Sequence, residues 1–128
     1  MAWLLDTNIV VHLIEGDAIV AARLAEARPP IAISAISRVE LENGVYRPAE
    51  RQAVKREALA IFLATVDVMA FDDAVAGCYA DIVATLGYSR SRVFDRMIAA
   101  QAVNANLTLA TRNTSDFQDI PGLKVESW

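Results

Sequence analysis

Short apolar runs that alternate with helical segments constrain the fold of this chain more than any other feature of its sequence. They are mainly apolar, as strands are when both faces of their sheet are covered. Runs of this kind span residues 2–5, 31–34, 66–71, 107–110 and 123–126. Strands separated by helices predict a parallel sheet with helices on both faces, an α/β domain of three layers, α/β/α. At 128 residues the chain is expected to form one domain over residues 1–128.

The helical segments between these runs are indicated by apolar periodicity and by Gly and Pro stops. The clearest period begins at Val75, repeats at helical spacing, and is expected to end at Gly87. Other helices are predicted at residues 8–14, 17–27, 37–43, 52–64 and 95–105. Gly44 is expected to end the third of these in a left-handed cap. The apolar face of segment 52–64 is expected to carry Val54, Ala58, Ile61 and Phe62.

Composition and charge exclude several classes of protein. The net charge is −4 and the sequence pI is about 4.9, so the surface as a whole does not attract nucleic acid. Cys78, the single cysteine, excludes an internal disulfide, fits a reducing cytoplasm, and is expected in the core. The sequence shows no signal-peptide pattern and no apolar stretch of about 18 residues, so we expect no membrane span.

Four acidic residues, far apart in the sequence, are each expected near the carboxyl end of a strand. They are Asp6, Glu40, Asp95 and Asp116. Ligands of open parallel α/β sheets bind at that edge, so we expect the four carboxylates to meet there. Like charges at about 4 Å repel by roughly 4 kcal/mol at an effective dielectric of about 20. Such a set, without Cys or His partners, is typical of a site for Mg²⁺ or Mn²⁺.

Each acid also has a purely structural interpretation. Asp6 and Asp95 are compatible with helix N-caps. Ser37 and Glu40 have the spacing of a capping box, and Asp116 is compatible with a turn. Capping explains any one of these residues alone about as well as metal binding does, whereas four acids at one sheet edge favour a site.

Carboxylates that hold a divalent cation suit the hydrolysis of a phosphodiester. Asp6 and Asp95 are the first candidates for metal ligands, Glu40 is a candidate for binding metal or orienting water, and Asp116 completes the set. Hydroxyl and amide side chains near these acids are candidates for hydrogen bonds to a carboxylate, a metal-bound water or a phosphate, although turn and cap chemistry explains them equally well. These supporting residues are Thr7, Asn8, Thr111 and Asn113.

Four segments in order, LLDTNIVVHLI, ISAISRVELENGV, FDRMIAAQAVNANLTLATRNTSDF and PGLKVESW, give the chain a resemblance to PIN-domain ribonucleases. Specifically, it resembles the VapC-type toxins of type II toxin–antitoxin pairs over nearly its whole length. The resemblance implies a five-stranded parallel sheet and an endoribonuclease that depends on Mg²⁺ or Mn²⁺. It also implies a homodimer neutralised by a VapB-like antitoxin. The family's acidic positions correspond to Asp6, Glu40, Asp95 and Asp116, with Asn113 close to the last.

Arginines surround these positions, and each is either a solvated surface residue or a contact to RNA phosphate. The candidates for phosphate contact are Arg90, Arg92, Arg96 and Arg112. A second basic cluster, more typical of a solvated helix face, comprises Arg47, Arg51, Lys55 and Arg56. His12 is expected to be a partly buried helix residue, and Trp3 and Trp128 are expected to be packing residues.

Two other functions compete with the nuclease hypothesis. A non-catalytic module on the same fold would bind protein or RNA without metal or cleavage. A phosphoryl-accepting receiver domain is disfavoured because Leu5-Asp6-Thr7 supplies only one acid after the first strand. A Rossmann dehydrogenase is excluded because no GxGxxG motif follows that strand.

Overall fold

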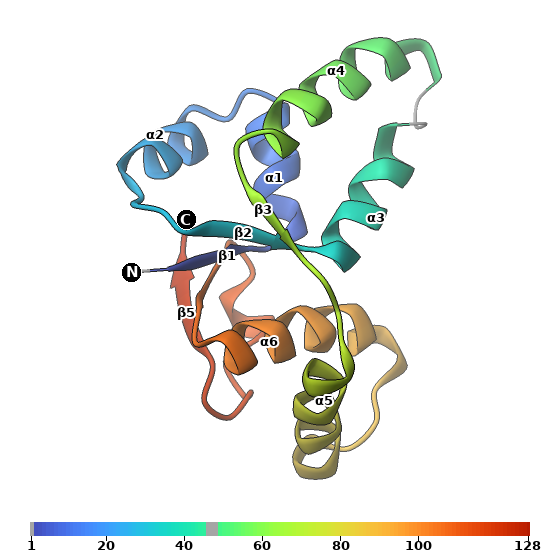
Figure 1. Ribbon diagram of the computed structural model, residues 1–128, viewed down its shortest axis with the longest axis vertical. Helices are drawn as coiled ribbons and strands as arrows, with labels where there is room; N and C mark the ends of the chain where they lie inside the picture. The colour runs from blue at the N-terminus through green and yellow to red at the C-terminus, as the bar shows by residue number, and fades with distance from the viewer. Residues whose placement is uncertain (1, 46–48) are drawn as a thin grey trace.

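The computed structural model describes residues 2–45 and 49–128, which form a parallel sheet between two layers of helices (Figure 1). The strands are β1 (Trp3–Leu5), β2 (Ile31–Ser34), β3 (Asp67–Met69), β4 (Thr108–Thr111) and β5 (Lys124–Ser127). They lie in the order β3-β2-β1-β4-β5, and every neighbouring pair is parallel. The predicted five-stranded parallel α/β/α sheet is therefore confirmed.

Helices cover both faces of this sheet (Figure 1). One layer contains α1 (Thr7–Ile14), α2 (Ala18–Glu26), α3 (Ala35–Val45) and α4 (Gln52–Leu63). The opposite layer contains α5 (Asp73–Leu86) and α6 (Val93–Ala105). Three short 3₁₀ helices lie in the connections: η1 (Ala49–Arg51), η2 (Arg90–Arg92) and η3 (Thr114–Asp116).

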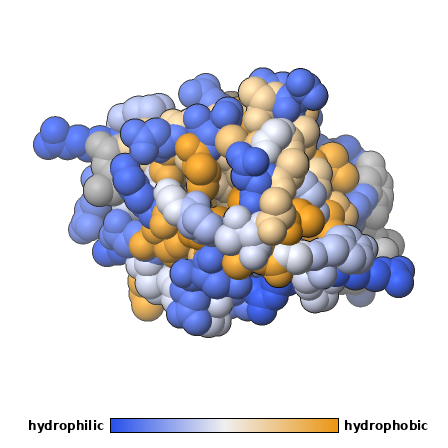
Figure 2. Space-filling model, turned by 90° about the horizontal axis from the view of Figure 1, so that it is seen from below, coloured by the Kyte–Doolittle hydropathy of each residue, from blue (hydrophilic) through white to orange (hydrophobic). Residues whose placement is uncertain are grey.

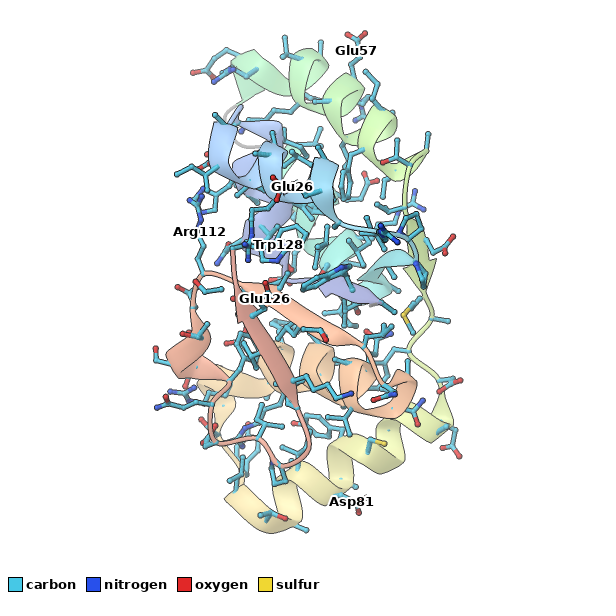
Figure 3. The ribbon with its side chains drawn as sticks, turned by 90° about the vertical axis from the view of Figure 1, so that its left-hand side faces the viewer. Glu26, Glu57, Asp81, Arg112, Glu126 and Trp128 are labelled. Carbon is cyan, nitrogen blue, oxygen red and sulfur yellow. The ribbon has the colours of Figure 1, made fainter. Side chains whose placement is uncertain are left out.

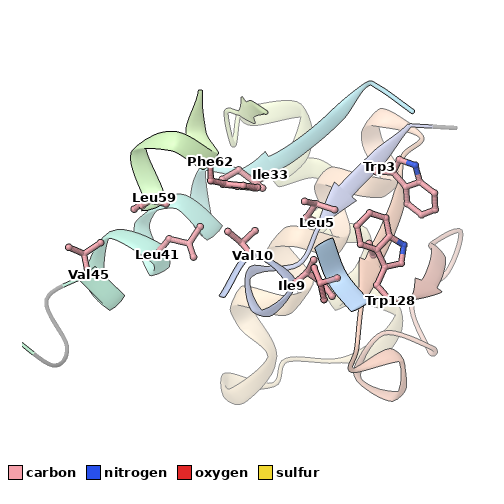
Figure 4. Packing of buried hydrophobic residues seen from close by; sticks show 12 residues of the cluster. Trp3, Leu5, Ile9, Val10, Ile33, Leu41, Val45, Leu59, Phe62 and Trp128 are labelled. Atoms are coloured by element: carbon pink, nitrogen blue, oxygen red, sulfur yellow. The ribbon is translucent and has the colours of Figure 1, made fainter. Parts of the chain in front are cut away.

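Side chains of the central strand alternate between the two layers, as the pleat requires. Trp3 and Leu5 pack into the core under α1–α4, and Leu4 packs into the core over α5 and α6. Figure 4 shows the first core, where Trp3 and Trp128 meet edge to face with ring centroids 5.2 Å apart. Both tryptophans are buried, so the prediction that they are packing residues is confirmed.

Several helix ends follow from local residue chemistry. The side chain of Asp17 accepts 3.0 Å hydrogen bonds from the amides of Ile19 and Val20 and so caps α2. Asp72 caps α5 through the amide of Val75, also at 3.0 Å. Gly87, with φ of 81°, ends α5 as predicted, in a conformation that glycine adopts without strain.

The structure corrects two predicted helix features. The helix α3 begins at Ala35, not at residue 37, and it continues through Gly44 to Val45. Gly44 is therefore helical and not a left-handed cap; the positive-φ glycines of the described chain are Gly16, Gly87 and Gly122. Since Val45 is buried against the first core, its packing favours the extra turn over termination at Gly44.

The predicted apolar face of α4 is right only in part. Phe62 is buried as predicted and Ala58 is partly buried, whereas Val54 and Ile61 are 61% and 63% exposed. The buried face is instead centred on Leu59 and Phe62, which lie about one turn apart and pack into the core beneath α4.

Three further sequence predictions concern Cys78, His12 and the second basic cluster. Cys78 is only partly buried at the margin of the second core, so it is not a true core residue. His12 is partly buried on α1, as expected. Arg47 of the second basic cluster lies outside the described residues.

Figure 2, which views the molecule from the α5 side, shows hydrophobic and hydrophilic residues intermingled on that face. Over the described ranges, no helix is long and apolar enough to cross a membrane.

Candidate active site at the ends of β1 and β4

The strand order places a topological switch point between β1 and β4. From β1 the chain proceeds to β2 on one side, while β4 pairs with β1 on the other. Asp6 directly follows β1, and its amide donates a 2.9 Å hydrogen bond to the carbonyl of Ala110 on β4. Ligands of open parallel sheets bind in the crevice at such a point. Asp6 therefore lies where the fold itself predicts a site.

Two hydrogen bonds fix the carboxylate of Asp6, which is only 5% exposed. Its Oδ1 accepts from the amide of Thr7 at 2.8 Å, and its Oδ2 accepts from the hydroxyl of Thr111 at 2.8 Å. The Thr111 oxygen also accepts from the amide of Asn113 at 3.0 Å, which leaves its proton for Asp6. The Asp6 carboxylate therefore has a single defined orientation, and it also serves as the N-cap of α1.

Glu40, on α3, is held by a second hydroxyl. The Oγ1 of Thr7 lies 2.8 Å from Oε1 of Glu40 and 2.8 Å from Oγ of Ser37. Because a hydroxyl has one proton, Thr7 donates it to the carboxylate, and Ser37 is then free to donate its own proton to Thr7. Thr7 thus joins the start of α1 to α3 and connects the settings of Asp6 and Glu40.

Asp95 and Asp116 approach the same edge from the other layer. Asp95 is the third residue of α6 and is half-buried, and Asp116 ends η3 after β4. Burial raises the pKa of Asp95, and the charges of Asp6 and Asp116 raise it further, while Arg92 opposes the shift. The acids on the two layers are therefore close enough to interact through space.

Burial is also the main cause that raises the pKa of Asp6. The hydrogen bonds from Thr111 and Thr7 oppose that effect, and the charges of Glu40 and Asp116 add to it. Taken together, the four sequence-predicted acids are brought to one edge and form one electrostatic unit. We refer to Asp6, Glu40, Asp95 and Asp116 as the acidic site.

The acidic site is less compact than the sequence suggested. Within residues 2–45 and 49–128, no three His, Cys, Asp or Glu side chains lie close enough to ligate one ion together. Mutual repulsion of carboxylates explains the spacing, since each close pair is unfavourable by several kcal/mol without a cation between them, roughly 4 kcal/mol at 4 Å. The donor set still fits a hard divalent cation, because every acidic donor is a carboxylate oxygen.

The structural interpretations of these acids can now be separated. Asp6 does cap a helix, whereas Asp95 lies inside α6, whose N-cap is Arg92. Ser37 and Glu40 do not form a capping box, because both lie within α3. The hydroxyl of Ser34 instead accepts a 2.9 Å hydrogen bond from the amide of Ile36 at the start of that helix.

The candidate arginines have different surroundings. Arg92 donates from Nη1 to the carbonyl of Asp116 at 3.0 Å, and the same atom lies 3.7 Å from the Asp116 carboxylate. Arg96 is buried and donates to the carbonyl of Gly87 at 2.6 Å. Arg90 is exposed on η2. Contact of any of them with RNA phosphate stays a prediction, and the burial of Arg96 leaves it little surface for one.

Arg112 points away from the acidic site, toward α2 and the end of β5 (Figure 3). Its Nη2 lies 2.9 Å from the Asp17 carboxylate, and its Nε donates to the carbonyl of Trp128 at 3.1 Å. The amide of Val20 is the main cause that lowers the pKa of Asp17, and Arg112 adds to it. Arg112 is thus engaged in contacts that stabilise the fold.

The supporting polar residues differ in whether they contact the acids. Thr7 and Thr111 make direct hydrogen bonds to the acids, whereas the side chains of Asn8 and Asn113 are exposed. Two contacts at the site were not predicted from the sequence. Ser37 contacts Thr7, and Arg92 contacts Asp116. The motif around Glu40 contained a signal for the first, since Ser37 lies one turn before Glu40 and was interpreted only as a cap.

An apolar groove of about 470 Å³ opens beside the acidic site, between α1, α3 and α4. Its apolar lining includes Val11, Ile14, Leu41, Val45, Val54, Ala58 and Leu59. Glu40 belongs both to this lining and to the acidic site, so the groove leads directly to the carboxylates.

Comparison with known proteins identifies the family. The sequence profile described as "PIN domain" matches residues 3–123. The chain belongs to the PIN-domain family. This assignment agrees with the sheet order and with the acidic site at the carboxyl ends of the strands.

Full-length relatives narrow the assignment. A tRNA(fMet)-specific endonuclease VapC from Shigella flexneri is 32% identical and covers 100% of this PIN-domain chain and 98% of its own length. The structure of VapBC2 from Rickettsia felis bound to a promoter DNA fragment matches with a TM-score of 0.89 and 29% identity, covering 100% and 99%. DNA-bound VapBC from Salmonella typhimurium matches with a TM-score of 0.82 and 26% identity, covering 100% and 98%. The predicted VapC-type resemblance is confirmed.

Proposed function

We propose that this PIN-domain protein is a metal-dependent endoribonuclease and the toxin of a VapBC-type pair, acting in the cytoplasm, where its RNA substrate is. The observation that carries the proposal is the acidic site, in which Asp6 and Glu40 are each oriented by a threonine hydroxyl. The Shigella flexneri relative, described as a tRNA(fMet)-specific endonuclease, supports RNA as the substrate.

The oxygen donors fit Mg²⁺ or Mn²⁺, for which Asp6 and Asp95 are the proposed ligands and Asp116 an outer-shell group. When bound, such an ion polarises a water molecule for attack on the phosphodiester and offsets charge on the leaving oxygen. The residues of the chain position these events. Thr111 favours the charged form of the buried Asp6 carboxylate, because its hydrogen bond opposes the effect of burial on the pKa of Asp6.

Glu40 has a separate role in this proposal. The Thr7 hydroxyl donates a 2.8 Å hydrogen bond to Oε1 of Glu40, and this bond orients the Glu40 carboxylate. A carboxylate held in this way orients the attacking water and accepts its proton. Arg92, which contacts Asp116, neutralises part of the negative charge that RNA phosphates meet on approach.

The test compares purified wild type with Asp6→Asn and Asp95→Asn on a structured RNA such as tRNA, with Mg²⁺, with Mn²⁺, or with EDTA. Asp81→Asn is the matched control, since Asp81 is an exposed acid on α5 that is not part of the acidic site (Figure 3). We expect cleavage by wild type and Asp81→Asn only when metal is present. Equal cleavage by wild type and Asp6→Asn, or cleavage that persists in EDTA, would contradict the proposal.

A non-catalytic RNA- or protein-binding module is the second candidate, and the absence of a ready three-ligand cluster among the described residues favours it. It predicts that no RNA is cleaved under any metal condition. It also predicts that partner binding survives Asp6→Asn and Asp95→Asn unchanged. The same assay therefore separates the two functions.

We further propose that the apolar groove receives an amphipathic segment of a VapB-like antitoxin, and that the chain forms a homodimer. The groove suits such a segment because most of its lining is apolar, with Glu15, Arg51 and Lys55 among the charged residues that also line it. Its lining includes Glu40 of the acidic site, where an antitoxin Arg is electrostatically favoured. The Rickettsia felis and Salmonella typhimurium VapBC structures are complexes of related chains, which supports the existence of a partner.

Two exposed residues on α4 provide a matched test of the groove. Val54 lines it, whereas Ile61, equally exposed on the same helix, does not. The probe is a VapB-like antitoxin, co-expressed with each variant. Val54→Glu is expected to escape growth rescue by that protein, and Ile61→Glu is expected to remain rescued. Rescue of both variants alike would place the antitoxin elsewhere.

A further inference from the structure

The large aromatic side chains of residues 2–45 and 49–128 differ in exposure, and Phe71 and Tyr79 are partly buried. In the described chain, Trp3, Phe62, Phe117 and Trp128 are buried. Tyr88 and Phe94 are instead 71% and 58% exposed. The remaining large apolar side chains that are exposed are all aliphatic: Ile19, Val39, Val54, Ile61 and Val68. The exposed aromatic rings of the described residues thus lie within a seven-residue stretch, a concentration that core packing does not explain.

This stretch borders the acidic site. Phe94 directly precedes Asp95 in the first turn of α6. Tyr88 directly follows Gly87, whose carbonyl accepts the 2.6 Å hydrogen bond from Arg96 on that same first turn. The connection from α5 to α6 is also attached to the acidic site by the contact of Arg92 with Asp116. The backbone positions of Tyr88 and Phe94 are therefore close to the helix end that carries Asp95.

The local charge differs from that of the whole molecule. Between Gly87 and Arg96 the sequence has Arg90, Arg92 and Arg96 against one acid, Asp95, whereas the whole chain carries −4. Arg90, which lies between the two aromatic residues in the sequence, is exposed. Aromatic faces interleaved with arginines are the usual surface for single-stranded nucleic acid, where bases stack on rings and cations contact the backbone. We call Tyr88, Arg90 and Phe94 the aromatic rim.

We propose that Phe94 and Tyr88 stack on unpaired bases of the RNA next to the phosphodiester bond that is cleaved, with Arg90 contacting the backbone. Stacking selects an unpaired segment, because a base inside a duplex has no free face for a ring. The place of the rim next to the scissile bond depends on the proposed nuclease function. The binding itself does not, so it is measured without cleavage.

The test uses the Asp6→Asn background with Mg²⁺ and a fluorescein-labelled single-stranded RNA of roughly ten nucleotides, long enough for one such site. Affinity is read by fluorescence anisotropy, and gels verify that the RNA stays intact. Phe94→Ala is expected to weaken binding by about 5- to 150-fold, the range for loss of one base–ring stack. Phe94→Leu is expected to weaken binding as much, whereas Phe94→Trp retains it. Val39→Ala, at an exposed aliphatic residue of α3, is the control and leaves affinity unchanged.

A second probe isolates stacking from charge. An abasic oligonucleotide of the same length keeps the phosphates but has no bases. It is expected to bind wild type and Phe94→Ala equally, while Arg90→Ala weakens its binding. Loss of abasic binding in Phe94→Ala would overturn the stacking proposal, since the ring would then act through the local fold.

Other outcomes also decide the proposal. Unchanged RNA affinity in Phe94→Ala and Tyr88→Ala overturns it. So does unchanged RNA affinity with loss of self-association in sedimentation, which would make the rim a contact between two copies of the chain. If wild type cleaves no RNA but Phe94→Ala still weakens binding, the stacking stands and the nuclease function fails. If wild type cleaves RNA and Phe94→Ala binds and cleaves equally well, the nuclease function stands and the stacking fails.

Discussion

The hydroxyl of Thr111 donates a 2.8 Å hydrogen bond to Oδ2 of Asp6, joining the ends of two adjacent parallel strands. The bond crosses the switch point of the sheet, so the orientation of the central acid depends on a residue 105 positions away. It also opposes the effect of burial on the pKa of Asp6. Thr111 is therefore a positioning residue for the acidic site.

Replacing Thr111 by Val keeps the shape of the side chain but removes this hydrogen bond. The pKa of Asp6 should rise further, because burial and the neighbouring acids are then less opposed. The acidic limb of the pH–rate profile for RNA cleavage should move to higher pH. Stability should fall by about 1.5–3 kcal/mol, the usual value of a hydrogen bond to a charged group. Thr108→Val, at the opposite end of β4, is the control and should leave the pH profile in place.

The raised pKa of Asp6 makes a prediction about stability. A folded-state pKa above the ordinary value of 3.8 means that the folded protein holds this proton more tightly than the unfolded chain does. The ionised carboxylate therefore reduces stability at neutral pH, and the reduction disappears as pH falls through the raised pKa. Asp6→Asn should increase the free energy of unfolding at pH 7 by about 1 kcal/mol, typical of relieving active-site strain.

Urea unfolding of wild type and Asp6→Asn across the acidic range measures this effect. The two curves of stability against pH should converge as pH falls through the raised pKa toward 3.8. Asp81→Asn, at an exposed acid of α5, should follow wild type throughout. A lower stability of Asp6→Asn at neutral pH would mean that the capping and Thr111 contacts outweigh the burial of charge.

Arg92→Ala should change the acidic site without unfolding it. The ion pair with Asp116 is partly exposed and 3.7 Å long, so its loss should destabilise the protein by less than about 1 kcal/mol. Removing the cation should raise the pKa of Asp95, which Arg92 lowers, and should tighten Mn²⁺ binding, because one competing positive charge is gone.

Mn²⁺ titration followed by electron paramagnetic resonance measures the affinity of this variant. Arg92→Lys keeps the charge and should resemble wild type, and Arg28→Ala removes an exposed charge outside the site and should also resemble it. Weaker Mn²⁺ binding in Arg92→Ala would show that the arginine supports the cation site indirectly, through the position of Asp116.

Trp128→Ala should be strongly destabilising. The indole is buried, packs edge to face on Trp3, and lies beneath the guanidinium of Arg23 at 5.9 Å. Loss of a buried Trp side chain typically lowers stability by about 3–5 kcal/mol. Urea denaturation gives the value, and near-ultraviolet circular dichroism reports the loss of the Trp3–Trp128 pair. Trp128→Phe retains an aromatic ring and should lose clearly less.

The sheet and the general position of the acids were predictable because both follow from strong, local signals. Short apolar runs between helices leave a covered parallel sheet as the main solution, and such a sheet collects its strand-end residues at one edge. Asp6 directly follows β1, and Asp116 ends the short helix η3 after β4. Glu40 lies in the second turn of α3, and Asp95 lies in the first turn of α6. The sequence therefore placed all four without any knowledge of tertiary contacts.

Most of the details that could not be predicted from the sequence depend on tertiary packing. Segment 52–64 offers two apolar faces about 100° apart, and only the core decides that Leu59 and Phe62 are buried rather than Val54 and Ile61. The hydrogen bonds of Thr7 across to α3, and of Arg92 to Asp116, arise from such packing. The acids were predicted to lie closer together than they do, because repulsion between carboxylates cannot be read from a sequence.

Asp6 holds the first turn of α1 through Oδ1, and an amide or a hydroxyl side chain can make the same bond. Losing the central charge by a single base change to Asn would therefore leave the shape of the protein and its groove intact. A copy of this gene inactivated by that change would still encode a protein that binds the same antitoxin. By competing for the antitoxin, this inactive protein would leave active toxin molecules elsewhere in the cell without their inhibitor.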